Sequence, residues 1–75
     1  MSHSILHTIA EARFYAQEDL VIAKGIGIYE DVMDAIDMLH LIGEAETTVL
    51  ADDWNEDTLS QIITIGQFVN DHRSI

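Results

Sequence analysis

The chain has 75 residues, which bounds it to one small domain, and its 14 acidic and 3 basic residues give a formal net charge of −11. This excess of negative charge argues against direct binding to nucleic acid or to an anionic membrane. Cysteine is absent, which excludes disulfides, a thiol nucleophile and cysteine-ligated zinc, and permits the cytoplasmic location that we expect. The apolar runs are too short to span a bilayer, and no segment has the pattern of a signal peptide.

The hydrophobic content favours folding, whereas the high net charge opposes it. Hydrophobic residues make up 48% of the chain, enough for it to fold despite its charge. A domain of this size buries only about 60% of the surface that its unfolded chain exposes. The apolar surplus must therefore be exposed, covered by a partner, or covered by a second copy of the chain.

Proline is absent, only four glycines occur, and apolar residues recur at helical spacing, so the sequence predicts an all-α fold. The first helix is expected over about residues 4–24, and Gly25 is placed to end it in the left-handed conformation. An alternative is a break at residues 17–19 that divides this segment into two helices. The predicted core stripe of the first helix consists of Ile5, Ile9, Ala12, Ala16, Leu20 and Ala23.

The second helix is expected over about residues 28–44. Its predicted inner face consists of Tyr29, Val32, Met33, Ile36, Leu39, His40 and Gly43. Residues 46–57 are expected to form a connection that Val49, Leu50 and Trp54 anchor to the core.

The third helix is expected over about residues 56–71, with Asn55, Asp57 or Thr58 as its N-terminal cap. Its predicted inner face consists of Leu59, Ile62, Ile63, Gly66 and Val69. Short connections between three such helices predict a small three-helix bundle that forms a single domain over residues 1–75.

Charge is distributed unevenly along the chain. No Lys or Arg occurs between Gly25 and His72, whereas the same stretch holds eleven acidic residues. Carboxylates on successive turns of a helix lie about 5–6 Å apart, which is of the order of the phosphate spacing in nucleic acid. Two interpretations stay open: a solvated face that keeps the protein soluble, or a surface for a basic partner. The predicted partner-binding residues are Glu30, Asp31, Asp34, Asp37 and Glu44, with Met38 and Leu41 among or beside them.

The first helix is apolar on a second side. Phe14 with Val21, and Tyr15 with Ile22, are i, i+7 pairs that point away from the core stripe. A helix that is apolar on more than one side is buried between layers or lies at an oligomer interface. We therefore predict a homodimer through these four residues, because closed two-fold dimers are the commonest oligomers. The alternative is again a broken first helix whose halves both fold onto the core.

No pattern in the sequence predicts catalysis. His3, His7 and Glu11 share a helical face at the spacing of zinc ligands, but they lie at a fraying helix end and lack a fourth ligand. The serines lack a nucleophile signature, and Gly25 and Gly27 lack the third glycine of a dinucleotide-binding fingerprint. The sequence predicts a protein that is not an enzyme and binds no metal or cofactor.

Residues 31–70 resemble part of an acyl carrier protein. Asp31-Val32-Met33-Asp34-Ala35-Ile36-Asp37-Met38 is similar to the start of that family's acidic recognition helix, and residues 63–69 are similar to the opening of its last helix. Val32 stands where the family has the serine that carries phosphopantetheine. The resemblance therefore implies a carrier-like adaptor that lacks the arm.

By size, charge and lack of catalytic groups, the chain also resembles small acidic phage proteins that inhibit nucleic-acid-handling enzymes by DNA mimicry, such as anti-CRISPR and anti-restriction proteins. We predict a non-enzymatic module that binds, and thereby inhibits, a basic nucleic-acid-handling protein through its carboxylates. The alternatives are the carrier-like adaptor and a structural helical subunit of a larger assembly.

Overall fold

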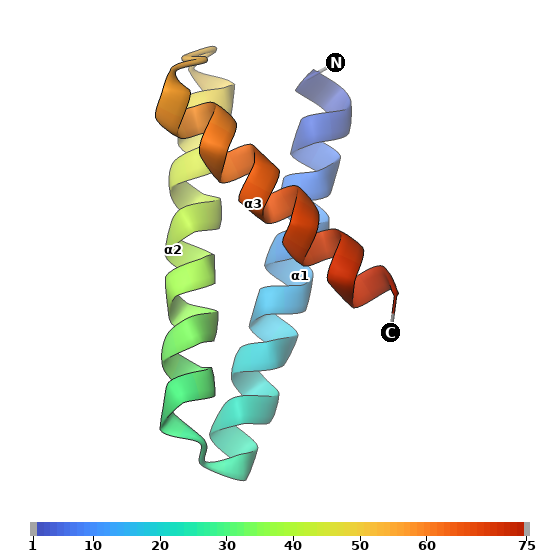
Figure 1. Cartoon of the computed structure of the whole chain (residues 1–75), viewed down its shortest axis with the longest axis vertical. Coiled ribbons are helices and arrows are strands. Elements are labelled where there is room, and N and C mark those ends of the chain that lie inside the picture. The colour runs from blue at the N-terminus through green and yellow to red at the C-terminus, as the bar shows by residue number, and fades with distance from the viewer. Residues whose placement is uncertain (1, 75) are drawn as a thin grey trace.

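A computed structural model describes residues 2–74 and confirms the all-α, three-helix prediction. Helices α1 (Ser2–Ile26), α2 (Tyr29–Leu50) and α3 (Glu56–Arg73) account for nearly all of these residues, and no strand occurs among them. In Figure 1, α1 and α2 form an antiparallel hairpin, and α3 crosses the half of it that holds the start of α1 and the end of α2. The half that holds the α1–α2 turn is not crossed by a third helix (Figure 1).

Helix α1 is continuous, so the predicted alternative of a break at residues 17–19 is wrong. The helix ends at Ile26, and Gly27 rather than Gly25 is the residue in the left-handed conformation, with φ +83°. The N–H groups of Gly27 and Ile28 donate to the carbonyl oxygen of Ala23, at 2.8 and 3.2 Å. A residue just past a helix end adopts the left-handed conformation in this arrangement, which glycine does without strain.

Helix α2 is longer than predicted and ends at Leu50 instead of residue 44. Ala45 and Val49 are buried at i, i+4 spacing, and this continuation of the core stripe extends the helix. Val49 is an anchor as predicted, whereas Leu50 and Trp54 are exposed. The connection to α3 therefore consists of residues 51–55 only.

The inner face of α2 differs from the predicted one. Its buried residues are Ala35, Ile42, Ala45 and Val49. Tyr29, Met33 and His40, which were expected to face inward, are exposed. The side of α2 that carries Ala35 and Ala45 faces inward, because small side chains let two helix backbones approach closely. Ala12 and Ala16 of α1 belong to the same buried cluster and contribute matching small residues.

Helix α3 begins at Glu56 and is capped by Asn55, one of the three predicted caps. The Asn55 side chain accepts a hydrogen bond of 2.8 Å from the N–H of Thr58. Thr58 is buried, and its hydroxyl donates to the carbonyl oxygen of Asp53 at 2.9 Å. Ile65 and Val69 face the core as part of a stripe that starts at Thr58. The predicted inner residues Leu59 and Ile63 are exposed, because this stripe is rotated from the expected one.

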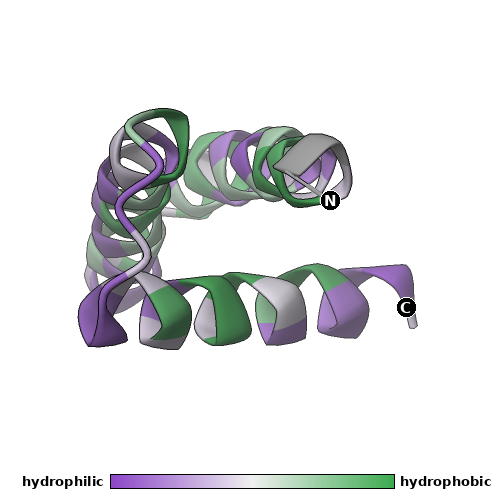
Figure 2. Ribbon diagram, turned by 90° about the horizontal axis from the view of Figure 1, so that it is seen from above, coloured by the Kyte–Doolittle hydropathy of each residue, from purple (hydrophilic) through white to green (hydrophobic). Residues whose placement is uncertain are grey.

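The core lies where the three helices meet. Ile9 of α1, Ile42 of α2 and Ile65 of α3 are each at most 1% exposed. Seen from above in Figure 2, the three helices lie on three sides of this region. Within residues 2–74, no helix combines the length and the apolar character that a membrane crossing needs.

Candidate partner-binding surface

Arg13 joins α1 to α2. Its Nη1 and Nη2 atoms donate to the two carboxylate oxygens of Glu46, each at 3.0 Å. These hydrogen bonds lower the pKa of Glu46 and raise that of Arg13. One of the three basic residues is thus engaged within the fold, at the end of the hairpin that α3 crosses.

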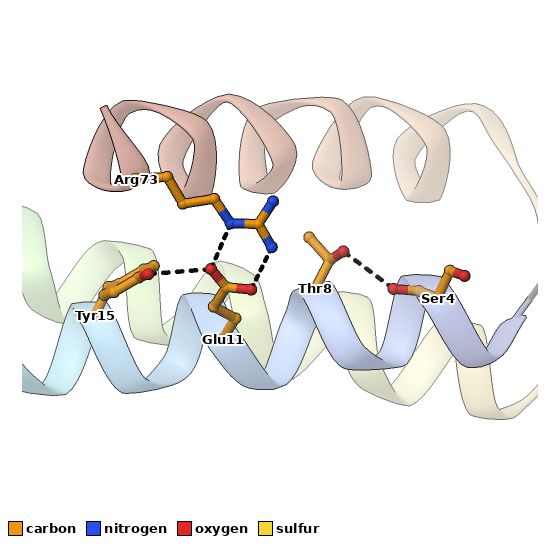
Figure 3. Close-up of polar contacts among 5 residues, drawn as sticks. All are labelled: Ser4, Thr8, Glu11, Tyr15 and Arg73. Atoms are coloured by element: carbon orange, nitrogen blue, oxygen red, sulfur yellow. Dashed lines mark hydrogen bonds and ion pairs between the residues drawn. The ribbon is translucent and has the colours of Figure 1, made fainter. Parts of the chain in front are cut away.

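Arg73 joins α3 to α1 in the same way. Its guanidinium donates two hydrogen bonds to the Glu11 carboxylate, which also accepts one from the Tyr15 hydroxyl at 3.0 Å (Figure 3). The hydrogen bonds from Arg73 and Tyr15 outweigh the opposing effect of burial and lower the pKa of Glu11 from 4.5 to about 2. A second basic residue is therefore also engaged within the fold.

His72 fixes the end of α3 beside these residues. Its ring stacks on Tyr15 at a centroid distance of 5.1 Å and contacts Phe68 at 4.3 Å. Its Nδ1 lies 2.9 Å from the carbonyl oxygen of Phe68, and its Nε2 lies 2.9 Å from Asp19. Burial by itself lowers the pKa of His72, but these two hydrogen bonds and the neighbouring carboxylates raise it overall.

The four predicted dimer residues do not share one surface. Tyr15 is half-buried in the packing of α1 against α3, so its assignment to an exposed dimer face is wrong. Phe14 and Val21 are 61% and 71% exposed. Ile22 is exposed as well, but it lines a groove between α1 and α2.

The predicted acidic surface on α2 is exposed to solvent. Its carboxylate residues are all exposed: Glu30, Asp31, Asp34, Asp37 and Glu44. Glu44 accepts a hydrogen bond from Gln61 of α3 at 3.1 Å. Met38 and Leu41 are half-buried against the core, so the expectation of Leu41 as an exposed apolar anchor is corrected. Both pack against the buried cluster, and Met38 also lines a groove beside α1.

A groove of about 410 Å³ runs between α1 and α2 beside the end of α3. Ala23 and Ala35 are buried and form its floor. We name it the open-end groove, and its lining consists of Asp19, Ile22, Ala23 and Ile26 of α1, Asp31, Asp34, Ala35 and Met38 of α2, and Phe68 of α3. The structure thus brings Ile22, expected at a dimer interface, together with three of the predicted partner-binding residues.

The groove combines apolar and acidic side chains. Among the described residues, Arg13 and Arg73 form their ion pairs with Glu46 and Glu11, outside the groove. Lys24 is exposed but does not line it. The carboxylates of Asp31 and Asp34 therefore border an apolar surface without a basic residue of this chain beside them.

The sequence did not reveal this groove, because its existence depends on where α3 crosses the hairpin. It also depends on the alanine-lined face of α2 being the inner one. The spacing of Ala12, Ala16 and Ala23 in α1, with Ala35 and Ala45 in α2, is the signal that would have indicated the correct face.

The three residues considered as zinc ligands are not brought together as a described site. The side chain of His3 lies outside the described residues, His7 is exposed, and Glu11 is bound by Arg73. Among the side chains that are described, no three histidine or acidic residues converge in a way that would hold a metal ion.

No protein-family model, curated protein or solved structure matches this chain. The resemblance of residues 31–70 to acyl carrier proteins stays a prediction from the sequence. Val32, at the position of that family's modified serine, is half-buried on α2.

Proposed function

We propose that this protein is a non-enzymatic interaction module that binds a basic protein surface through the carboxylates of α2. One observation carries the proposal: Glu30, Asp31, Asp34, Asp37 and Glu44 of α2 are exposed, while Arg13 is bound to Glu46 near the C-terminal end of α2 and Arg73 is bound to Glu11 of α1. Helical carboxylates without nearby bases repel one another slightly, at about 0.2–0.5 kcal/mol per i, i+4 pair. A basic partner relieves this repulsion on binding.

The nucleic-acid groove of another protein is the target that we favour, in the cytoplasm. Glu30, Asp34 and Asp37 follow one another at about 4.5–6 Å along the axis of α2. Such a row offers negative charges at intervals of the same order as phosphates, on a rigid helix. By occupying the nucleic-acid groove of its partner, this protein would inhibit that partner, as do the phage DNA mimics that the chain resembles in size and charge.

We also propose a homodimer, with its contact at Phe14 and Val21, two exposed large apolar residues on the side of α1 opposite the core stripe. Covering such side chains is favourable at about 25 cal/mol per Å² of apolar surface. Light scattering should give a dimer for the wild type and a monomer for a Phe14→Asn, Val21→Asn variant. A monomeric wild type would remove this part of the proposal.

Capture of nucleic-acid-binding proteins from a bacterial lysate at low and high salt tests the main proposal. Asp34→Asn with Asp37→Asn should weaken capture about tenfold, or about 1.4 kcal/mol. The matched control, Glu18→Gln with Glu56→Gln, removes two exposed carboxylates outside the acidic face and should leave capture nearly unchanged. High salt should release the partner, because it screens charges.

Three results would contradict the proposal. They are the absence of any basic partner, retention that does not depend on salt, and equal weakening by the control variant. The last result would mean that net charge alone, and not the acidic face of α2, attracts the captured proteins.

A further inference from the structure

We propose that the open-end groove receives an amphipathic helix whose apolar stripe is flanked by Lys or Arg, supplied by a basic partner. This inference rests on the proposed function, because it takes a basic partner as given. It adds the form of the binding segment and the place where it binds.

The apolar part of the groove is exposed in the free protein. Ile22 and Ile26, at i, i+4 on α1, are 52% and 66% exposed. They line the same groove as the half-buried side chains of Met38 and Phe68. Alternating exposed and half-buried apolar side chains of this kind accept an apolar stripe of a helix, as in helix-in-groove recognition.

The charges beside this apolar surface select the occupant. Asp31 and Asp34 lie at i, i+3 on α2 and line the groove, and Asp19 faces it from α1. Asp19 is already bound to His72, whereas Asp31 and Asp34 form no ion pair with another described residue. Their complement is a segment whose apolar residues are flanked by cations.

A second copy of this chain does not satisfy that charge pattern. Each copy carries a net charge of −11, and two of its three basic residues are held in ion pairs within the fold. Docking a second copy here would bring carboxylates toward Asp31 and Asp34, which costs free energy. The outward face with Phe14 and Val21, rather than the groove, is where self-association belongs.

The open-end groove lies beside the end of α3, between the same two helices on which α3 packs. At one end of the hairpin, α3 packs over the α1–α2 seam with Ile65 and Val69 buried against it. The other end is not crossed by α3 (Figure 1), and there the open-end groove runs between α1 and α2, beside Phe68 of α3. A partner helix in the groove repeats there the packing that α3 provides at the first end.

Two synthetic peptides of about four helical turns test the inference, with Leu and Lys as their only residue types. One places Leu at i, i+3, i+4 and i+7, and the other has the same composition with Leu dispersed. Fluorescence anisotropy should show at least about tenfold tighter binding of the amphipathic peptide. Ile22→Asn with Ile26→Asn should abolish that preference. Leu59→Asn with Ile63→Asn, which changes two exposed residues of α3 that do not line the groove, should keep it.

The outcomes separate this inference from the proposed function. Equal binding of both peptides, weakened by Asp34→Asn with Asp37→Asn but not by the isoleucine substitutions, would overturn the groove and leave a purely electrostatic acidic face. A lack of binding by either peptide would also overturn the groove, while salt-dependent capture of a basic protein would still support the proposed function. Loss of the preference in the Leu59, Ile63 variant as well would overturn the groove as the binding place, because these two residues lie outside it.

Discussion

Both ends of the α1–α2 hairpin contain apolar and acidic residues, but the ends differ in how far these residues are buried and paired. The closed end, which α3 crosses, buries Ile9, Ile42 and Ile65 almost completely. The open end, which holds the α1–α2 turn, buries only small side chains such as Ala23 and Ala35 along its seam. Its larger apolar residues are at most half-buried, and Ile22 and Ile26 are exposed.

Charges follow the same division. At the closed end, Glu46 and Glu11 bind Arg13 and Arg73 and thereby tie α2 and α3 to α1. At the open end, Asp31 and Asp34 form no such pair among the described residues. The comparison indicates that the closed end supplies the larger buried side chains and the Arg–Glu ion pairs, whereas the open end keeps apolar and acidic groups exposed, as the proposed partner binding requires.

The largest expected difference between the two ends is in the free energy of unfolding that is lost when an isoleucine is truncated to alanine. Ile42→Ala at the closed end removes a fully buried side chain and should lower the free energy of unfolding by about 2–5 kcal/mol. Ile26→Ala at the open end removes an exposed one and should change it by less than about 0.5 kcal/mol. Urea unfolding followed by circular dichroism measures both. Similar losses in the two variants would mean that the open end also supports the fold.

Acid should lower the stability of the fold by protonating Glu11 at the closed end, an effect that should be smaller than that of Ile42→Ala. Since the pKa of Glu11 is lowered in the folded state, its ion pair contributes stability above pH 4.5. This contribution is lost as the pH falls toward about 2, where Glu11 becomes protonated in the folded state as well.

Arg73→Gln isolates that effect from the many other carboxylates. The difference in Tm between the wild type and Arg73→Gln should be largest above pH 4.5 and should shrink toward pH 2. Lys24→Gln, a substitution of the exposed base in the last turn of α1, serves as the control. A difference that does not change with pH would show that the Arg73–Glu11 pair is not linked to folding.

Much of the fold could be predicted from the sequence because its strongest pattern is simple. The spacing of Ile9, Ala12 and Ala16 gave the core face of α1, and Asn55 was among the predicted caps of α3. The inner face of α2 was predicted wrongly, because bulky residues such as Tyr29 and Met33 were weighted above alanines. Close approach of two helices favours the small residues.

The candidate site was predictable only in part. Exposure of Asp34 and Asp37 follows from their place on the helix surface, and the sequence indicated it. The groove arises from tertiary structure, since it needs α3 to stop short of the α1–α2 turn. Helical periodicity places Ile22 on a side of α1, but it does not say that Asp34 lines the same groove.

The most direct test is an NMR titration of the labelled protein with the amphipathic Leu–Lys peptide. The account predicts the largest chemical-shift changes at Ile22, Ile26 and Met38, with little change at Phe14 and Val21. Changes centred on Phe14 and Val21, or changes confined to the carboxylate residues without the groove isoleucines, would contradict it.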